Sequence, residues 1–349
     1  MSDLPRKVEI AEEGPREGFQ IEKNPIASAD KIALIDALSA TGLRHIQVAS
    51  FVSPRLVPGW SDAEAVVAGF RPNPDIHYTA LWFNAAGLDR ALAFKDRLHL
   101  FGSISLAASE AFSLKNLNRD RAGQIEAMRK QTAAHIAAGV PVTRIGLQAA
   151  FGCNYAGDVA PAQVMAAIAD GLAIASEAGA SEAGASEAGA SEAGASEAGA
   201  SEAGASEAGV TIRDLTLADT MGWANPHQIE TVIGEVRNRW PELRLALHLH
   251  DTRGLGIANA MAGLRMGVAR FDAAVGGLGG CPFAGQPGAP GNIATEELAL
   301  LCAELGIATG IDLEALVEAG RLAERILDRR LPSAVLRGGT LARFRARAA

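Results

Sequence analysis

Two histidines end an apolar run in the second half of the chain, within the segment LALHLHDTRGLG. His248 and His250 are two residues apart, so both imidazole rings project from the same face of a strand. Two imidazoles at the carboxyl end of a barrel strand can bind a divalent metal ion. The alternative is an ordinary pair of inward-facing histidines with hydrogen-bond partners. Because Asp251 and Thr252 follow directly where the strand ends, we favour the metal interpretation.

An arginine and a glutamate stand side by side near the N-terminus, in VEIAEEGPREGFQ, where the first apolar run ends. The guanidinium of Arg16 can polarise a carbonyl group or stabilise an enolate oxygen. The carboxylate of Glu17 can bind a metal ion. Neighbouring arginine and glutamate residues are also common on ordinary protein surfaces, so this pair gains meaning only from partners elsewhere in the chain.

A glycine- and proline-rich segment, GGLGGCPFAGQPGAPGN, carries one cysteine, Cys281, and ends at Asn292. A loop with one thiol can bring an acid or a nucleophile to a substrate, or it can be a flexible loop with an incidental cysteine. The amide oxygen of Asn292 can bind a hard cation, or the residue can cap the helix that follows. Together with the arginine, the glutamate and the histidine pair, these groups suit the making or breaking of a carbon–carbon bond next to a thioester.

Short apolar runs alternate with helical stretches, and these elements must bring the groups together. We expect strands at residues 8–11, 45–51, 77–82, 98–104, 143–149, 212–218, 243–250 and 271–275. We expect helices at residues 29–41, 62–70, 122–138, 161–175, 226–239 and 256–266, with extra C-terminal helices at 292–306 and 312–327. Eight strands alternating with helices predict an α/β fold, most simply a closed (β/α)₈ TIM barrel. An open doubly wound sheet is the alternative, but no GxGxxG motif follows the first strand.

Composition limits the classes of function. The 349 residues suit one large barrel domain, residues 1–349, with a sizeable core. A net charge of −8 argues against nucleic acid and anionic membranes as partners. We see no apolar run long enough to cross a bilayer, and the charged start MSDLPRK is not a signal peptide. Three widely spaced cysteines fit free thiols in a reducing cytoplasm.

Residues 176–209 form a low-complexity repeat in which SEAG(A) recurs seven times. A period of five residues maintains no apolar face on a helix, because it advances the direction of each repeat by about 140°. The repeat is expected as an insertion between the helix at 161–175 and the strand at 212–218. In a (β/α)₈ barrel that connection lies on the face opposite the active site, so we expect the repeat to be tolerated without a catalytic role.

Several motifs together resemble the 3-hydroxy-3-methylglutaryl-CoA lyase family, which belongs to the metal-dependent lyase and synthase group. The motifs are EEGPREGFQIEK, HIQVASFVSPRLVP, SEAFSLKNLN, GCNYAGDVAP, TLADTMG, HLHDTRGLGIAN and GLGGCPFAGQPGAPGNIATEEL. The resemblance runs from Val8 to Leu327 and implies a TIM barrel. It also implies cleavage of a branched hydroxyacyl-CoA to acetyl-CoA and acetoacetate with Mg²⁺ or Mn²⁺, a place in leucine catabolism and a homo-oligomer, such as a dimer.

The resemblance also implies roles for individual residues. Arg16 is similar to the arginine that stabilises the enolate, Cys281 matches a mobile-loop thiol that takes part in proton transfer, and Asp219 resembles a carboxylate that supports the site. The residues that fall on metal ligands are Glu17, His248, His250 and Asn292. The residues that fall near the acyl part of the substrate are Gln20, Gln47, Ser50, Thr216 and Thr220.

Two departures from the family pattern fall on this site. The family has aspartate where this chain has Glu17, and glutamate where it has Gln47. The first change lengthens a metal ligand by one methylene, and the second removes a negative charge and a possible base. The cysteine loop is also two residues longer before Asn292. These changes bear on the choice of substrate more than on the fold or the reaction type.

Three functions follow from this combination of features. The favoured one is a hydroxyacyl-CoA lyase acting on 3-hydroxy-3-methylglutaryl-CoA or on a different 3-hydroxyacyl-CoA. A condensing synthase of the isopropylmalate or homocitrate type shares the barrel and the HxH motif, but such enzymes usually carry further regions after the barrel. A catalytically silent paralogue that binds a CoA ester is suggested by Gln47, whereas the metal ligands and Cys281 count against it.

Overall fold

The computed structural model describes residues 4–22, 24–186, 209–280 and 290–348. Its centre is an eight-stranded sheet in which every neighbouring pair of strands is parallel. The strand order is β3-β2-β1-β10-β9-β8-β5-β4. The bounds of these strands are β1 Glu9–Glu12, β2 His45–Ser50, β3 His77–Leu81, β4 Gly102–Ala107, β5 Val142–Gln148, β8 Val210–Ala218, β9 Arg244–His248 and β10 Arg270–Ala273.

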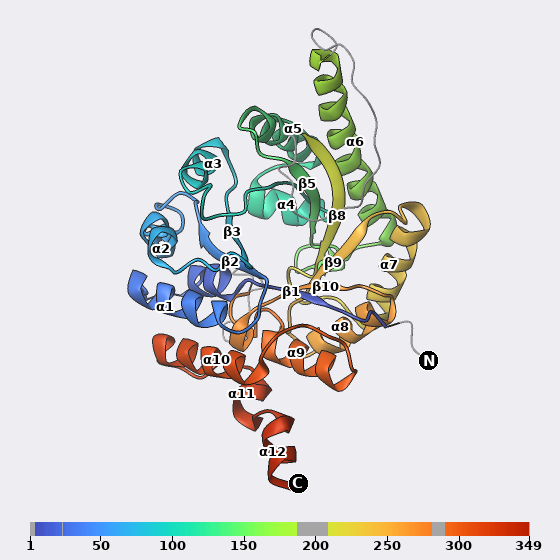
Figure 1. Ribbon diagram of the computed structural model, residues 1–349. Coiled ribbons are helices and arrows are strands. Elements are labelled where there is room, and N and C mark those ends of the chain that lie inside the picture. The colour runs from blue at the N-terminus through green and yellow to red at the C-terminus, as the bar shows by residue number, and fades with distance from the viewer. Residues whose placement is uncertain (1–3, 23, 187–208, 281–289, 349) are drawn as a thin grey trace, which may run out of the picture.

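The two end strands of this order, β3 and β4, are joined through the segment that precedes β4, where the His99 N–H donates to the Tyr78 carbonyl of β3 at 2.7 Å. Figure 1 shows the helices arranged around the strands. The predicted (β/α)₈ TIM barrel is therefore confirmed. In such a barrel the carboxyl ends of all strands open onto one face, which is where catalytic residues lie.

Helices cover the outside of the barrel. Their bounds are α1 Ser28–Ser39, α2 Ala63–Gly69, α3 Ala85–Leu92, α4 Glu110–Leu117, α5 Arg121–Ala137, α6 Pro161–Ser186, α7 Pro226–Arg239, α8 Gly256–Arg265, α9 Thr295–Glu304, α10 Leu313–Leu327, α11 Ala334–Gly338 and α12 Leu341–Ala348. Local sequence explains where several begin: Asp120 caps α5, and Asn225 forms a capping box with Gln228 at the start of α7.

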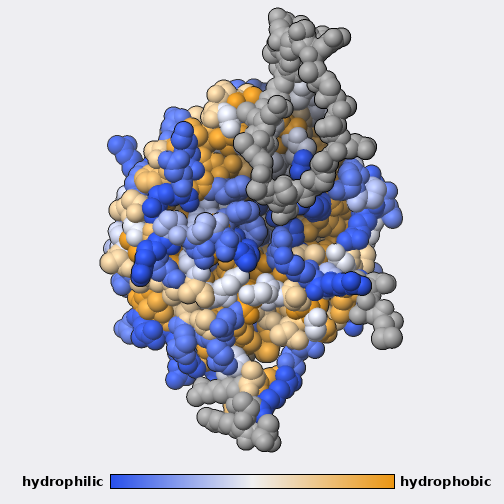
Figure 2. Space-filling model, viewed as in Figure 1, coloured by the Kyte–Doolittle hydropathy of each residue, from blue (hydrophilic) through white to orange (hydrophobic). Residues whose placement is uncertain are grey.

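Apolar strand residues form the core between sheet and helices, and Ile46, Leu217 and Leu247 are fully buried. Burying such side chains contributes about 1.5–3 kcal/mol each. Figure 2 shows hydrophilic residues gathered over the middle of the face in view, with hydrophobic residues in smaller areas between them. No described helix is long and apolar enough to cross a membrane.

Most predicted elements lie within a few residues of the observed ones. The helices α3, α4, α11 and α12 were not predicted, and three further differences concern β4, a hairpin and the repeat. The strand predicted at 98–104 is displaced to β4, Gly102–Ala107. A short antiparallel hairpin, β6 (Gly152–Cys153) with β7 (Gly157–Asp158), follows β5 and was not predicted. Its strands are too short to give an alternating pattern.

The third difference concerns the repeat. The predicted helix at 161–175 continues as α6 to Ser186 and so includes the first SEAGA units. Alanine and glutamate favour a helix strongly enough to extend one that has already begun, despite the recurring glycine. Figure 1 shows α6 projecting beyond its neighbouring helices. Residues 187–208 of the repeat lie outside the described residues.

Candidate metal centre and active site

Arg16 and Glu17 lie in a single π-helical turn, η1 (Gly14–Gly18), directly after β1. Gly14 is required there, because a Cβ atom would lie 2.4 Å from Oε1 of Glu12. The Glu12 carboxylate accepts the N–H groups of Gly14 and Val275 at 2.7 and 2.8 Å, and the Thr295 hydroxyl at 2.6 Å. Complete burial raises the pKa of Glu12 to about 8. This carboxyl group therefore joins the end of β1 to η3 (Val275–Gly277) and α9.

Three side chains hold the guanidinium of Arg16. Its Nε donates to Oε1 of Gln47 on β2, and one Nη donates to Oε2 of Glu13. The same Nη lies 3.2 Å from Oε2 of Glu17. Burial opposes the positive charge, but the two carboxylates outweigh it and raise the pKa of Arg16. Arg16 is therefore a fixed cation at the carboxyl end of the barrel.

Glu17, His248 and His250 form a group that could hold a metal ion, since one ligand atom from each lies within 4.8 Å of the others. The two Nε2 atoms of the histidines are 3.3 Å apart. The Glu17 carboxylate lies 4.0 Å from Nε2 of His248 and 3.6 Å from Nε2 of His250. Burial alone would raise the pKa of Glu17, but Arg16 and both histidines hold it well below its usual range. Glu17 is thus ionised at neutral pH and able to bind a cation.

Asn292, the fourth predicted ligand, is buried beside this group. Its Nδ2 donates to Oε1 of Glu17 and to the Leu278 carbonyl, both at 3.0 Å. Its Oδ1 is buried without a hydrogen-bond partner within the described part of the chain. A buried oxygen without a donor is costly unless a ligand satisfies it. One carboxylate, two imidazoles and an orphaned amide oxygen are a donor set that fits a divalent cation.

The carboxylate of Asp272, which the sequence motifs did not indicate, contacts His248 on the ring nitrogen that faces away from the proposed metal position. Asp272 on β10 is the register partner of His248 on β9, and its Oδ2 lies 3.2 Å from Nδ1 of His248. Burial would lower the pKa of His248, but Asp272, Glu17 and Glu13 raise it to about 9. A carboxylate on the far nitrogen of a metal-binding histidine fixes the tautomer and orientation of the ring. The signal in the sequence was a polar residue within the apolar strand RFDAAV.

Asp219 follows β8 and is also buried at this end of the barrel. Its Oδ1 accepts the Trp223 N–H at 2.6 Å, whereas Oδ2 has no partner among the described residues. Burial raises the pKa of Asp219. The next residue, Thr220, accepts the Ala149 N–H on its hydroxyl oxygen at 2.9 Å. One carboxylate oxygen of Asp219 is thus free to meet a bound molecule.

The other predicted substrate residues lie on β2, on β8 or just after η1. Ser50 ends β2 and is fully buried, and its Oγ has no partner among the described residues; the same holds for Oε1 of Gln20. Thr216 is buried on β8, and Gln47 is engaged by Arg16. Unpaired buried polar atoms of this kind are expected where a ligand supplies the missing hydrogen bonds. Cys281, the remaining predicted residue, lies outside the described residues.

Glu13 is a further residue that the motifs did not single out. Its carboxylate is nearly buried, with 9% of the side chain exposed, and it pairs with Arg16. Gln47 leaves this site one carboxylate short of the family pattern, and Glu13 brings another carboxylate to it. The signal was the acidic pair Glu12-Glu13 at the end of an apolar strand, which spacing alone does not distinguish from a solvent-exposed pair.

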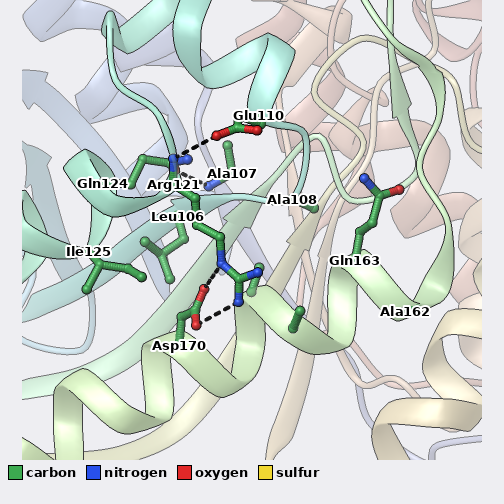
Figure 3. A pocket seen from close by; sticks show the side chains of 12 residues that line it. Leu106, Ala107, Ala108, Glu110, Arg121, Gln124, Ile125, Ala162, Gln163 and Asp170 are labelled. Carbon is green, nitrogen blue, oxygen red and sulfur yellow. Dashed lines mark hydrogen bonds and ion pairs between the residues drawn. The ribbon is translucent and has the colours of Figure 1, made fainter.

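A cavity of about 340 Å³ lies elsewhere, between α4, α5 and α6 on the outside of the barrel. Figure 3 shows Arg121 reaching across it to pair with Asp170, while the backbone of Arg121 meets Glu110. The residues that line it are small, apolar or already paired. None of the predicted site residues lines this cavity.

The fold and the site together define a class: a parallel barrel whose strand ends bring an arginine, buried carboxylates and a histidine pair to one possible metal position. Comparison with known proteins is more specific. The sequence model of the HMGL-like family matches residues 7–323, and the chain belongs to this family.

Characterised relatives span nearly the whole chain. It is 36% identical over 334 residues to hydroxymethylglutaryl-CoA lyase YngG of Bacillus subtilis, covering 94% of this chain and 96% of the relative. It is 40% identical over 319 residues to the 3-hydroxy-3-isohexenylglutaryl-CoA/hydroxy-methylglutaryl-CoA lyase of Pseudomonas aeruginosa, covering 91% and 92%.

Solved structures of HMG-CoA lyases are also similar to this chain. The Bacillus subtilis HMG-CoA lyase superposes with a TM-score of 0.80 at 34% identity, covering 97% of this chain and 99% of that chain. An HMG-CoA lyase from Acinetobacter baumannii, solved with coenzyme A and 3-methylmalate, gives a TM-score of 0.78 at 32% identity and covers 97% of each chain. The chain is thus similar to lyases in sequence and in fold.

Proposed function

We propose that this protein is a divalent-metal-dependent carbon–carbon lyase that cleaves 3-hydroxy-3-methylglutaryl-CoA, or a close analogue, to acetyl-CoA and acetoacetate. The observation that carries the proposal is the position of η1, which sets the Arg16 guanidinium beside the Glu17–His248–His250 group. Relatives named as lyases for this substrate, at 34–40% identity, support it.

The metal ligands in this proposal are Glu17, His248, His250 and the amide oxygen of Asn292. When bound, the cation supplies a Lewis acid that polarises substrate oxygen atoms and lowers the pKa of the substrate hydroxyl group. The protein fixes the position of these ligands through the Asp272–His248 hydrogen bond and through the Gly280 N–H, which donates to Glu17 at 3.1 Å. Mg²⁺ and Mn²⁺ are the cations we expect.

Arg16 is our candidate for stabilising the enolate. When the tertiary hydroxyl loses its proton, its oxygen becomes the ketone of acetoacetate, the neighbouring C–C bond breaks, and the electron pair passes to the acetyl-CoA enolate. The second Nη group of Arg16 makes no hydrogen bond within the described part of the chain, so it is available to the enolate oxygen. A preorganised cation acts most strongly where negative charge develops.

Two residues are our candidates for moving protons. Asp219 is the candidate acceptor of the hydroxyl proton, since its Oδ2 is buried, unpaired among the described residues and at the same end of the barrel. Cys281 is the candidate for protonating the enolate carbon to give acetyl-CoA, and this assignment rests on sequence alone. Gln20, Ser50, Thr216 and Thr220 are proposed to contact the acyl part of the substrate.

The test is turnover by purified protein. We expect acetyl-CoA and acetoacetate to appear in equal amounts from 3-hydroxy-3-methylglutaryl-CoA, to stop after chelation of divalent metal, and to resume with Mg²⁺ or Mn²⁺. Thioester binding without cleavage in the presence of metal would identify the silent paralogue instead. Acceleration of the condensation of acetyl-CoA with a keto acid, without cleavage, would identify a synthase.

A longer acyl branch is the second candidate substrate. The relative that is 40% identical is named for a 3-isohexenyl substituent as well as for the methyl compound. Position 47 carries a neutral amide in this chain, which removes a negative charge from the site without changing the size of the side chain. Comparing kcat/KM for the methyl and isohexenyl thioesters decides between the two.

Coenzyme A esters and a second copy of this chain are the partners we propose. The solved relative with coenzyme A and 3-methylmalate supports the thioester, and the oligomeric state rests on the family resemblance alone. Light scattering of the purified protein measures the oligomeric state, for which we expect a dimer.

A further inference from the structure

Two carboxylates lie near the guanidinium of Arg16, and of these only Glu13 makes no other side-chain hydrogen bond within the described part of the chain. Glu17 lies 3.2 Å from one Nη of Arg16, but it also accepts hydrogen bonds from Asn292 and Gly280 and lies beside the two histidines. Gln47 accepts the hydrogen bond of Nε but carries no charge. Among the described residues, Glu13 is thus the carboxylate whose hydrogen bond is made to Arg16 itself.

The backbone of Glu13 is fixed by contacts other than the one with Arg16. Its backbone N–H donates to the Ala273 carbonyl of β10 at 2.8 Å, and its carbonyl accepts the Glu17 N–H at 2.8 Å. It precedes η1 directly, so its side chain leaves the backbone at a point fixed by β1, β10 and η1. A carboxylate anchored in this way orients the planar guanidinium fork.

Two nitrogen atoms of the guanidinium meet one neutral acceptor and one carboxylate. Nε donates to the amide oxygen of Gln47, and one Nη donates to the carboxylate of Glu13, so both contacts orient the remaining Nη. Glu17 supplies one further negative charge at 3.2 Å. Position 13 or position 47 can provide the second negative charge, since both contact the same guanidinium.

We propose that Glu13 is a positioning residue that orients Arg16 and balances its charge, and that it supplies from position 13 the negative charge that position 47 lacks. This inference rests on the proposed function and assigns a residue that acts through Arg16 without touching the substrate. It predicts that the carboxylate can be moved from position 13 to position 47 with most of the activity retained.

The kinetic test uses Glu13→Gln, Gln47→Glu and the double variant. Glu13→Gln keeps the shape and an acceptor but removes the charge, so we expect kcat to fall about 10–100-fold with little change in KM, the range for losing a charge-assisted hydrogen bond. The double variant should recover at least about tenfold of that loss, because contacting residues couple. Glu177→Gln, which removes the charge of a surface carboxylate paired with Arg129, is the matched control and should leave kcat unchanged.

Three measurements separate failure of this inference from failure of the proposed function. Turnover by the wild-type protein tests the function alone. Mn²⁺ affinity and melting temperature of Glu13→Gln should stay near wild type, because Glu13 is not a proposed ligand. The Arg16 Nε–Hε NMR signal, assigned by its absence in Arg16→Lys, tests positioning without substrate: in Glu13→Ala its exchange with solvent should accelerate about tenfold or more. Unchanged exchange, or a double variant no better than Glu13→Gln, would overturn the assignment.

Discussion

The two ends of the barrel each hold a group of histidines, and the pKa of His248 in one group and that of His45 in the other are shifted in opposite directions. At the carboxyl end, carboxylates from Asp272, Glu17 and Glu13 raise the pKa of His248 to about 9 against the effect of burial. At the other end, burial and the rings of His77 and His99 lower the pKa of His45 to about 4.

Packing geometry does not explain this difference, because imidazole rings contact each other in both groups. The ring centroids of His248 and His250 are 5.1 Å apart, and those of His45 and His77 are 5.0 Å apart. Carboxylates explain it: three act on His248, whereas Glu9 is the carboxylate that acts on His45 and is opposed by Arg270. Burial removes water in both places, and the neighbouring charges then decide which form of the imidazole persists.

The largest expected effect comes from removing a proposed metal ligand at the carboxyl end of the barrel. Glu17→Gln removes the ionised member of the proposed ligand set, so we expect activity to fall by more than about 100-fold, beyond the range for residues that only support ligands. Mn²⁺ binding measured by calorimetry should weaken in parallel. Glu9→Gln at the opposite end is the matched control, and equal losses in both variants would contradict the metal site.

A smaller effect should follow from removing the carboxylate behind His248. Asp272→Asn leaves the proposed ligands in place but loses the negative charge on Nδ1, so metal affinity should fall about 10–100-fold. Asp214→Asn is the control: this carboxylate on β8 is held by Arg244 and Arg270, and its loss should lower stability without changing metal affinity. Unchanged affinity in Asp272→Asn would mean that Asp272 does not support the ligand.

The pH dependence of the free energy of unfolding tests the lowered pKa of His45 at the amino end of the barrel. Because His45 has a folded pKa of about 4, the unfolded chain binds more protons than the folded one below its ordinary pKa of 6.5. Stability is therefore complete above that value and is lost as the pH falls from 6.5 towards 4. His45→Gln should remove about 1–2 kcal/mol of this loss, allowing for its partial exposure. Urea unfolding at pH 7, 5.5 and 4 measures it, and identical slopes in both proteins would contradict the assignment.

The sequence predicted the barrel because alternating apolar strands and helices leave few arrangements. It also predicted that Glu17, His248 and His250 meet, since residues at strand ends share one face. Asp272 and Glu13 were missed for a physical reason. Their roles depend on strand register and on the path of η1, which set the direction of single side chains and leave no mark in spacing. Family resemblance supplied the substrate class, which no contact among the described residues specifies.

The smallest expected effect concerns the repeat. Deleting residues 180–208 retains Gly209, whose carbonyl accepts the Val142 N–H at 3.0 Å, and retains Glu177, which pairs with Arg129. We expect turnover within about twofold of wild type, because shortening a connection far from the site changes mainly loop entropy. Circular dichroism checks that the variant folds. A large loss of turnover in a folded variant would show that the repeat has a role.

The join that Glu12 makes between β1 and the far end of the chain has a consequence for protein synthesis. Its partners Val275 and Thr295, and the proposed ligand Asn292, are translated more than 250 residues after it. A ribosome-bound chain that has just completed η1 therefore carries an arginine and glutamates with none of those partners. The proposed metal site cannot assemble stepwise from the N-terminus, so acquisition of the cation becomes a late event that follows closure of the barrel. Pulse-labelled nascent chains truncated before Asn292 should accordingly fail to retain the metal.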